Sequence, residues 1–233
     1  MLAHHPQILA PVVKEQHFFD NEEHYSRGLK AYLKAFPLVP LRGPAKVTFE
    51  ATPSYLFVEQ AAARIKEHLP KVKLIVVLRD PIRRAYSAWN MFRDFGNSPR
   101  QLHLHDPRTF AQAVDDELNG RTDVLAHRYL ARGLYAPQLK RFFALFGRDQ
   151  VLVIDHRKLN SDPAGVMQEC CRFLGLRPFA GDPAFLRIRD NVRPYSEPLD
   201  PELSKDLRAY FAPHMAELQQ LLGQEWDLLE SAQ

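Results

Sequence analysis

The residues from Leu74 to Ser87 could form a binding site for an anion. An apolar, mostly β-branched run, 74–78, is typical of a strand buried on both faces, and Arg79 follows it directly. Asp80 and Pro81 are typical of a helix start, and Ser87 lies two turns into that helix. Free N–H groups and the helix dipole favour negative charge at such a junction. The alternative is a buried strand whose Arg79 only pairs with a core carboxylate.

Glu15 and His17 could take part in proton transfer. If their segment is extended, Glu15, His17 and Phe19 share one face, because side chains alternate along a strand. A carboxylate and an imidazole on one face can share a proton-transfer task. The alternative is a solvated glutamate and a hydrogen-bonded histidine.

Three further features have structural as well as functional explanations. His103 and His105 are spaced so that they could bind a metal, but no cysteine or second cluster supports this, and a solvated loop is the favoured explanation. Cys170 and Cys171 lie in a predicted helix, where they are expected to pack in the core. The arginine-bearing segment 179–198 is either a solvated loop or a flexible segment that closes over an anion.

The composition is that of a globular α/β protein. The chain has 233 residues, of which 45% are hydrophobic and 25% are charged, and this is enough for one large core. The net charge of +3 is too small to indicate a nucleic-acid partner, but it suits an acidic small molecule or polyanion. Two adjacent cysteines imply no disulfide framework and favour a reducing compartment, so we expect a cytoplasmic protein. No apolar run reaches the length of a membrane span, and no signal-peptide pattern is present.

Alternating strand and helix patterns predict a parallel sheet with helical crossovers. The strand at 46–50, the helix at 58–69 and the strand at 74–78 should form one right-handed crossover unit. Residues 1–6 resemble the last turn of a helix. The other strands are predicted at 8–15, with a break at Pro11, and at 150–154. The other helices are predicted at 26–36, from 81, and at 109–118, 124–130, 134–146, 163–174 and 201–222.

Several short motifs follow one another along nearly the whole chain. They are Glu15-Gln16-His17-Phe18-Phe19-Asp20 with Glu23-His24-Tyr25, then Glu50-Ala51-Thr52-Pro53-Ser54-Tyr55, then Leu78-Arg79-Asp80-Pro81 with Arg84, Tyr86 and Ser87, then Arg132-Gly133-Leu134-Tyr135, then Phe173-Leu174-Gly175-Leu176, and finally Pro198-Leu199-Asp200-Pro201. In this order they resemble the PAPS-dependent sulfotransferases, especially the heparan-sulfate glucosaminyl 3-O-sulfotransferase-like branch. PAPS is 3′-phosphoadenosine 5′-phosphosulfate.

The resemblance implies a fold and a reaction. The fold is a three-layer α/β sandwich with a central parallel sheet, related to P-loop nucleotide kinases, in a single sulfotransferase domain over residues 1–233. The reaction moves a sulfuryl group from PAPS to an alcohol or amine and leaves 3′-phosphoadenosine 5′-phosphate (PAP). A carbohydrate or another hydroxyl compound is the expected acceptor, and neither a metal nor a nucleic-acid partner is expected.

The resemblance also implies roles for individual residues. Glu15 is expected to be the general base, with His17 in the same catalytic group. The 3′-phosphate of the nucleotide should bind Arg79 and Ser87, while Arg193 and Tyr195 close on the nucleotide. Asp20, Thr52 and Tyr55 are expected to bind the acceptor.

Two departures from the family pattern affect these expectations. The family's first strand and its Lys-x-Gly-Thr-Thr loop, which cradles the phosphosulfate, have no counterpart in the sequence, so we expect an N-terminally truncated domain. The glucosaminyl branch has a lysine where Ala51 stands, which leaves the acceptor open. The alternative function is a non-catalytic nucleotide- or glycan-binding remnant. A P-loop kinase is disfavoured, because Gly-x-x-x-x-Gly-Lys-Ser/Thr does not occur.

Overall fold

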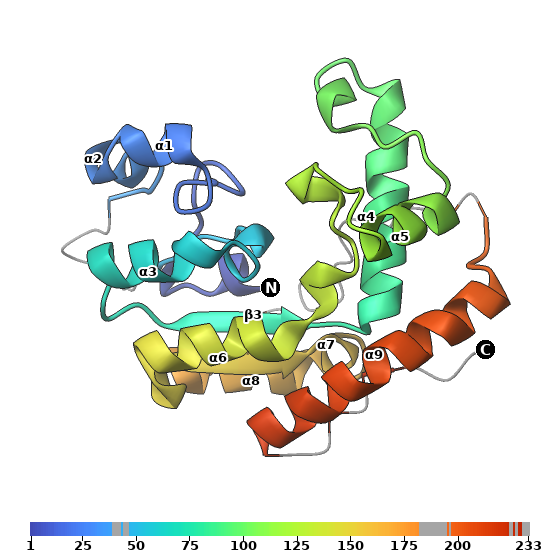
Figure 1. The fold of residues 1–233 in the computed structure, drawn as a ribbon. Helices are drawn as coiled ribbons and strands as arrows, with labels where there is room; N and C mark the ends of the chain where they lie inside the picture. Colours follow the sequence, from blue (N-terminus) through green and yellow to red (C-terminus); the bar gives the residue numbers. More distant parts are fainter. Residues whose placement is uncertain are drawn as a thin grey trace. The chain divides into compact units, whose positions relative to one another are not determined.

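The computed structural model describes residues 1–38, 43, 47–181, 195, 197–223, 226, 228 and 229. The chain forms two compact units, each built from two segments of the sequence (Figure 1). The first unit comprises Met1–Leu78 and Gln138–Asp190, and the second comprises Arg79–Pro137 and Asn191–Gln233. That both act as one sulfotransferase domain stays a prediction.

Two pairs of parallel strands lie in the first unit. β1 (Ile8–Leu9) pairs with β2 (Val47–Thr48), and β3 (Leu74–Leu78) pairs with β4 (Val151–Asp155) along its whole length. The parallel pairing agrees with the sequence prediction. In the described part of the chain the two pairs share no ladder hydrogen bond. The expected crossover unit from β2 to β3 is therefore not contained in one hydrogen-bonded sheet, because β2 forms its ladder with β1.

Helices cover both faces of the β3–β4 pair (Figure 1). On one face, Val76 and Val153 belong to an apolar cluster with residues of α3 (Glu59–His68) and α6 (Tyr135–Phe146). On the other face, Ile75 and Ile154 pack with residues of α7 (His156–Ser161) and α8 (Pro163–Leu174). Alternate side chains of a strand point to opposite faces, and apolar residues on both faces are typical of a buried parallel sheet. These three layers are the arrangement that the sequence predicted.

The two cysteines take part in this packing. Cys170 and Cys171 lie on α8, and both are free and buried. Cys170 packs with Ile154 of β4, whereas Cys171 packs with Met167 and Phe179. The expected role in core packing is confirmed.

The segment after β1 differs from the prediction. In place of the expected helix at 26–36 the chain forms two short helices, α1 (Glu22–Ser26) and α2 (Leu29–Leu33), because Gly28 has a φ of 77° and separates them. β1 ends before Pro11, which has no N–H group for a ladder. Residues 2–4 form a single 3₁₀ turn, not the end of an α-helix.

Three longer helices build the second unit: α4 (Pro81–Asp94), α5 (Phe110–Leu118) and α9 (Pro201–Leu222). They pack around the fully buried rings of Trp89, Tyr129 and Phe211. The expected helix at 124–130 is only a 3₁₀ turn, Leu125–His127. After this turn the N–H of Tyr129 donates to the carbonyl of His127 at 3.0 Å and not to that of Leu125, so the α-helical hydrogen-bond pattern does not continue.

Short 3₁₀ turns connect the longer elements. They lie at Pro53–Tyr55, Phe95–Asn97, Leu102–Leu104, Ala131–Gly133 and Arg148–Gln150. Across the residues described, no helix combines the length and the apolar character needed to cross a membrane.

Candidate active site

The loop from Glu15 to Asp20 has an unusual backbone. Glu15 and His17 have positive φ angles of 53° and 49°, in the left-handed region that costs a non-glycine residue about 1 kcal/mol or more. Phe18 and Phe19 are buried in the core of the first unit and anchor the loop. The expected extended segment is therefore wrong, and Phe19 does not share a face with the two chemical side chains.

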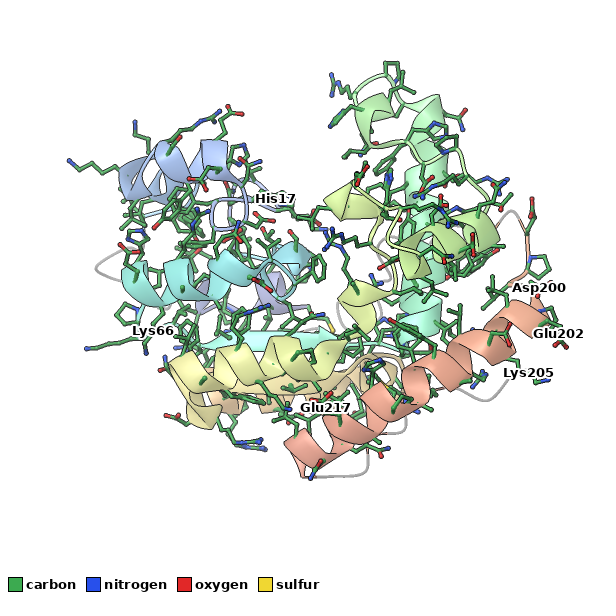
Figure 2. All side chains as sticks on the ribbon, in the orientation of Figure 1. His17, Lys66, Asp200, Glu202, Lys205 and Glu217 are labelled. Carbon is green, nitrogen blue, oxygen red and sulfur yellow. The ribbon has the colours of Figure 1, made fainter. Side chains whose placement is uncertain are left out.

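The side chains of this loop form a cluster of charged groups around His17, which is labelled in Figure 2. His17 Nδ1 lies 2.9 Å from Asp20 Oδ2, and His17 Nε2 lies 3.7 Å from Glu15 Oε2. Ser54 donates to the same oxygen of Asp20, and its Oγ lies 3.4 Å from His17 Nδ1. The Asp20 carboxylate is buried, whereas the side chains of His17 and Glu15 are 42% and 52% exposed. The structure thus brings Glu15, His17 and Asp20 together, and their roles stay predictions.

These contacts set the charges of the three groups. The hydrogen bond to Asp20 and then the ion pair with Glu15 raise the pKa of His17 from 6.5 to about 9. The ion pair with His17 lowers the pKa of Glu15. Burial works against ionisation of Asp20, but hydrogen bonds from His17 and Ser54 outweigh it and lower the pKa of this carboxyl. At neutral pH the site therefore holds an imidazolium between two carboxylates.

The carboxylate of Glu50 accepts hydrogen bonds from three hydroxyl groups. Tyr32 Oη donates to it at 2.9 Å, Thr52 Oγ1 at 2.5 Å and Tyr55 Oη at 2.7 Å. Burial and the nearby Glu50 charge raise the pKa of both tyrosines, so their hydroxyls remain protonated donors. The oxygens of Thr52 and Tyr55, which the sequence predicts to bind the acceptor, both hydrogen-bond to Glu50.

Sequence reasoning missed two members of this arrangement, Glu50 and Ser54. Both stand in the same short segment as Thr52 and Tyr55. Thr52 is extended, with φ −120° and ψ 102°. Glu50 stands two positions before Thr52, so alternation along an extended segment could have identified Glu50. Ser54 lies in the 3₁₀ turn Pro53–Tyr55, and no alternation signal indicates it.

The start of α4, in the second unit, is closed by its own cap. Asp80 Oδ1 accepts hydrogen bonds from the N–H groups of Ile82 and Arg83 at 2.8 and 2.9 Å. The expectation of free N–H groups for an anion is therefore wrong for these two amides, because the Asp80 carboxylate occupies them.

Arg79 is held by its backbone, while its side chain has few contacts. The Arg79 carbonyl accepts a hydrogen bond from Tyr135 Oη at 2.9 Å, and its Nη2 lies 3.4 Å from Tyr195 Oη. Across the described residues no carboxylate pairs with Arg79, so the alternative of a core ion pair is not observed. Ser87 is half-buried on α4 and has no direct hydrogen bond to Arg79. Arg193 lies outside the described residues.

The Tyr195 side chain, 46% exposed, lies against an aromatic stack in the second unit. Its ring centroid is 5.3 Å from that of Tyr86, which stacks on Trp89 at 5.4 Å. The Tyr86 hydroxyl donates to the carbonyl of Glu197 at 2.5 Å. These contacts fix Tyr195 beside Arg79.

Metal ligands do not gather in the residues that the structure describes. No group of three or more histidine, cysteine, aspartate or glutamate side chains there could hold a metal ion, and His103 and His105 belong to no such group.

Comparisons with known proteins point to one family. The sulfotransferase domain family matches residues 1–193. The mouse (Mus musculus) bifunctional heparan sulfate N-deacetylase/N-sulfotransferase 4 is 30% identical over 94% of this chain, which spans only 27% of that protein. Mouse heparan sulfate glucosamine 3-O-sulfotransferase 5 is 25% identical over 96% of this chain and 67% of its own length.

A solved structure agrees with these sequence matches. The crystal structure of a sulfotransferase from Alicyclobacillus acidocaldarius superposes with a TM-score of 0.76 at 30% identity, over 98% of this chain and 90% of that one. Because a sulfotransferase domain matches residues 1–193 and this relative covers nearly the whole chain, the protein belongs to the sulfotransferase family and has its P-loop-like α/β fold.

Proposed function

We propose that this protein transfers a sulfuryl group from PAPS to a hydroxyl or amine of a carbohydrate or other hydroxyl-bearing acceptor. The family match supports the reaction type. The names of the heparan sulfate N- and 3-O-sulfotransferases support a carbohydrate acceptor. The observation that carries the proposal is the pairing of an exposed Glu15 with a cationic His17.

Glu15 is the general base in this proposal. Its side chain is 52% exposed, so an acceptor can reach it, and its lowered pKa keeps it ionised at neutral pH. A sugar hydroxyl is a poor nucleophile, and a positioned base speeds such a step by about 10²–10⁴-fold. A weak base suffices, because the hydroxyl becomes strongly acidic as its oxygen bonds to sulfur. The acceptor proton then passes to Glu15.

His17 orients Glu15 and supplies positive charge. Its pKa of about 9 means that the ring is protonated at neutral pH and has no lone pair for a proton. Nδ1–H faces Asp20, so Nε2–H is directed to Glu15 and fixes that carboxylate. A cation held in place also stabilises negative charge that develops during transfer.

Arg79 fits the 3′-phosphate of the nucleotide. PAPS supplies a sulfuryl group that is already activated by its phosphate leaving group. The Arg79 guanidinium has no carboxylate partner in the described part of the chain, and arginine binds phosphate oxygens through two parallel hydrogen bonds. Ser87 adds a hydroxyl from α4, and Tyr195 and Arg193 complete the proposed nucleotide site.

The identity of the acceptor rests on fewer observations. Ala51 is exposed where the glucosaminyl branch has a lysine, so this chain lacks one cation near the loop. Asp20 is the residue proposed to line the acceptor site, whereas Thr52 and Tyr55, which the resemblance also assigns to it, direct their hydroxyls to Glu50. A glycan other than heparan sulfate, or another alcohol, is consistent with this difference.

The two buried thiols support a reducing location. Cys170 and Cys171 are free in the structure. Proteins with free cysteines and no disulfide framework are typical of reducing compartments. We therefore propose that the enzyme acts in the cytoplasm.

A binding function without turnover is the second candidate. The observation that favours it is that no Lys-x-Gly-Thr-Thr loop occurs in the 233 residues. Such a protein would bind the nucleotide through Arg79 and Ser87 but would not transfer the sulfuryl group.

The test measures transfer of radiolabelled sulfate from PAPS to a panel of polysaccharides, lipid-linked sugars and small alcohols, with the whole gene product that contains these residues. We expect Glu15→Gln to lower turnover by about 10²–10⁴-fold and to leave the affinity for PAP, measured by calorimetry, unchanged. Glu23→Gln is the matched control, because Glu23 is an exposed carboxylate on α1 that pairs only with Arg27 among the described ion pairs.

The possible outcomes of this assay distinguish the proposed reaction from the binding function. Turnover at the normal rate in Glu15→Gln contradicts the assignment of the base. Binding of PAP without transfer to any acceptor favours the binding function. Absence of both binding and transfer rejects the proposed reaction.

A further inference from the structure

Glu50 holds a carboxylate that is balanced by hydroxyl groups. It is half-buried just after β2, and it accepts hydrogen bonds from Tyr32, Thr52 and Tyr55 at 2.5–2.9 Å. No ion pair joins Glu50 to a basic side chain within the described residues. Hydrogen bonds to an ionised acceptor are stronger than those between neutral groups, so this carboxylate fixes the direction of three O–H bonds.

The direction of these O–H bonds determines what else the hydroxyls can do. A hydroxyl has one hydrogen and two lone pairs. Since Thr52 and Tyr55 use their hydrogens on Glu50, their oxygens face the neighbouring loop as acceptors only. The backbone N–H of Phe18 donates to Tyr55 Oη at 2.9 Å, and that of Phe19 does so at 3.4 Å. The N–H of His17 donates to Thr52 Oγ1 at 3.4 Å.

Three consecutive amides of the active-site loop are thus held by two hydroxyls that one carboxylate orients. The loop needs such support, because Glu15 and His17 both have left-handed backbone angles. A residue in that conformation persists only where its surroundings hold it, since relaxation to ordinary angles gains about 1 kcal/mol or more. Relaxation at His17 would turn its ring away from the partners on either side.

We propose that Glu50 is a positioning residue that acts through Tyr55 and Thr52 to hold the backbone of residues 17–19, and thereby aligns His17 with Glu15 and Asp20. This inference rests on the proposed sulfuryl transfer and deepens it. It gives Thr52 and Tyr55 a role inside the protein that differs from contact with the acceptor.

The hydrogen-bonding capacity of Tyr55 supports this assignment. Its single hydrogen is given to Glu50, and its two lone pairs face the N–H groups of Phe18 and Phe19. A phenolic oxygen with three partners has no capacity left for an acceptor molecule. Thr52, which is only 7% exposed, has one lone pair left.

Tyr55→Phe and Tyr32→Phe form a matched pair that tests the proposal. Both remove one hydroxyl from the Glu50 carboxylate and keep the ring, but only the Tyr55 hydroxyl bonds to the loop. Because small misplacements of reacting groups can cost about 10²-fold, we expect Tyr55→Phe to lower kcat by about 10–100-fold and to leave the KM for the acceptor nearly unchanged. Tyr32→Phe should leave both constants close to those of the wild type.

Glu50→Gln tests the positioning role of Glu50 directly. The amide keeps the shape of the side chain but replaces one acceptor oxygen with a donor, so one O–H bond must turn. We expect kcat to fall to a value between those of the two tyrosine variants. A higher KM for the acceptor with an unchanged kcat in Tyr55→Phe would instead assign that hydroxyl to substrate binding and overturn the proposal, as would equal losses in both tyrosine variants.

A readout without turnover separates this inference from the proposed reaction. The imidazole of His17 can be titrated by NMR, with its signal assigned from its absence in His17→Gln. We expect a pKa of about 9 in the wild type and in Tyr32→Phe, and a value shifted towards 6.5 in Tyr55→Phe. An unchanged titration in Tyr55→Phe contradicts the positioning role even if no sulfuryl transfer is ever detected.

Discussion

The loop that carries Glu15 and the junction that carries Arg79 hold their charges in different ways. In the loop, His17 pairs with a carboxylate on each side, and the strained backbone is held by hydroxyls more than 30 residues away in sequence. At the junction, the start of α4 is set by a neighbour in sequence, the Asp80 cap, and Tyr135 adds one hydrogen bond to the Arg79 carbonyl. The strand before it is less buried than the sequence predicts, because Val77 is 45% exposed. The Arg79 guanidinium has no carboxylate partner among the described residues.

This difference suits two different tasks. A group that transfers a proton needs a controlled pKa, and paired charges around His17 provide that control. A group that binds an external phosphate needs a charge that no internal partner neutralises, because an internal ion pair would have to be broken first. The loop and the junction therefore match a base and an anion-binding cation respectively.

Arg79→Ala gives the largest effect expected at the junction. A hydrogen bond to a charged group contributes about 1.5–3 kcal/mol, so we expect the Kd for PAP to rise by about 10–100-fold. Adenosine 5′-phosphate, which lacks the 3′-phosphate, should bind with unchanged affinity. Calorimetry with both nucleotides measures the two changes.

Arg83→Ala is the control for this experiment. Arg83 is an exposed arginine in the first turn of the same helix, so its removal changes the net charge by the same amount. An equal loss of affinity for both nucleotides in Arg79→Ala, or an equal effect of the two arginine variants, contradicts a specific contact with the 3′-phosphate.

Much of the fold follows from local signals in the sequence. The helix predicted at 201–222 has those bounds in the structure, because Asp200 caps its start and Gly223 ends it. The strand predicted at 150–154 is shifted by only one residue. The prediction of a helix at 26–36 is wrong, because Gly28 has a left-handed backbone that the apolar stripe around it does not indicate. The sequence predicts parallel strands, but the pattern of apolar residues in a single sequence does not indicate which strands pair with one another.

The candidate site was only partly predictable for the same reason. Glu15, His17 and Asp20 were identified by resemblance, and the proposed extended backbone that was to join them is wrong. The contacts that hold them come from residues such as Ser54, which is 34 positions from Asp20. Alternation of polar residues indicates a shared face, but it does not indicate what that face contacts.

Asp80→Ala tests whether the junction depends on its local cap. Loss of an N-cap costs about 0.5–2 kcal/mol, so we expect the free energy of unfolding to fall by an amount in this range, measured with urea. Asp200→Ala should cost less, because Asp200 is exposed and accepts one hydrogen bond, whereas Asp80 is buried and accepts two. Unchanged stability in Asp80→Ala would mean that packing alone positions α4.

The pH dependence of the free energy of unfolding tests the paired charges of the loop. Among the effects predicted here, we expect this one to be the smallest. The folded protein raises the pKa of His17 from 6.5 to about 9, so the charged form favours folding. This contribution is fully present below pH 6.5 and is lost as the pH rises through about 9. The groups that face the ring are Glu15, Asp20 and Ser54. Both carboxyls have lowered pKa values, so their contribution is lost only in acid.

The difference in unfolding free energy between the wild type and His17→Gln isolates this contribution from that of other titrating groups. We expect this difference to decrease between pH 6.5 and about 9, and to decrease further in added salt, because the ring is 42% exposed and solvent screens part of the interaction. At the junction, Arg79→Ala should show no such dependence in this range, because arginine does not titrate there. If the difference in unfolding free energy did not change with pH, folding would not raise the pKa of His17. The charges of the loop would then not be paired as proposed, and the contrast with the unpaired Arg79 at the junction would be lost.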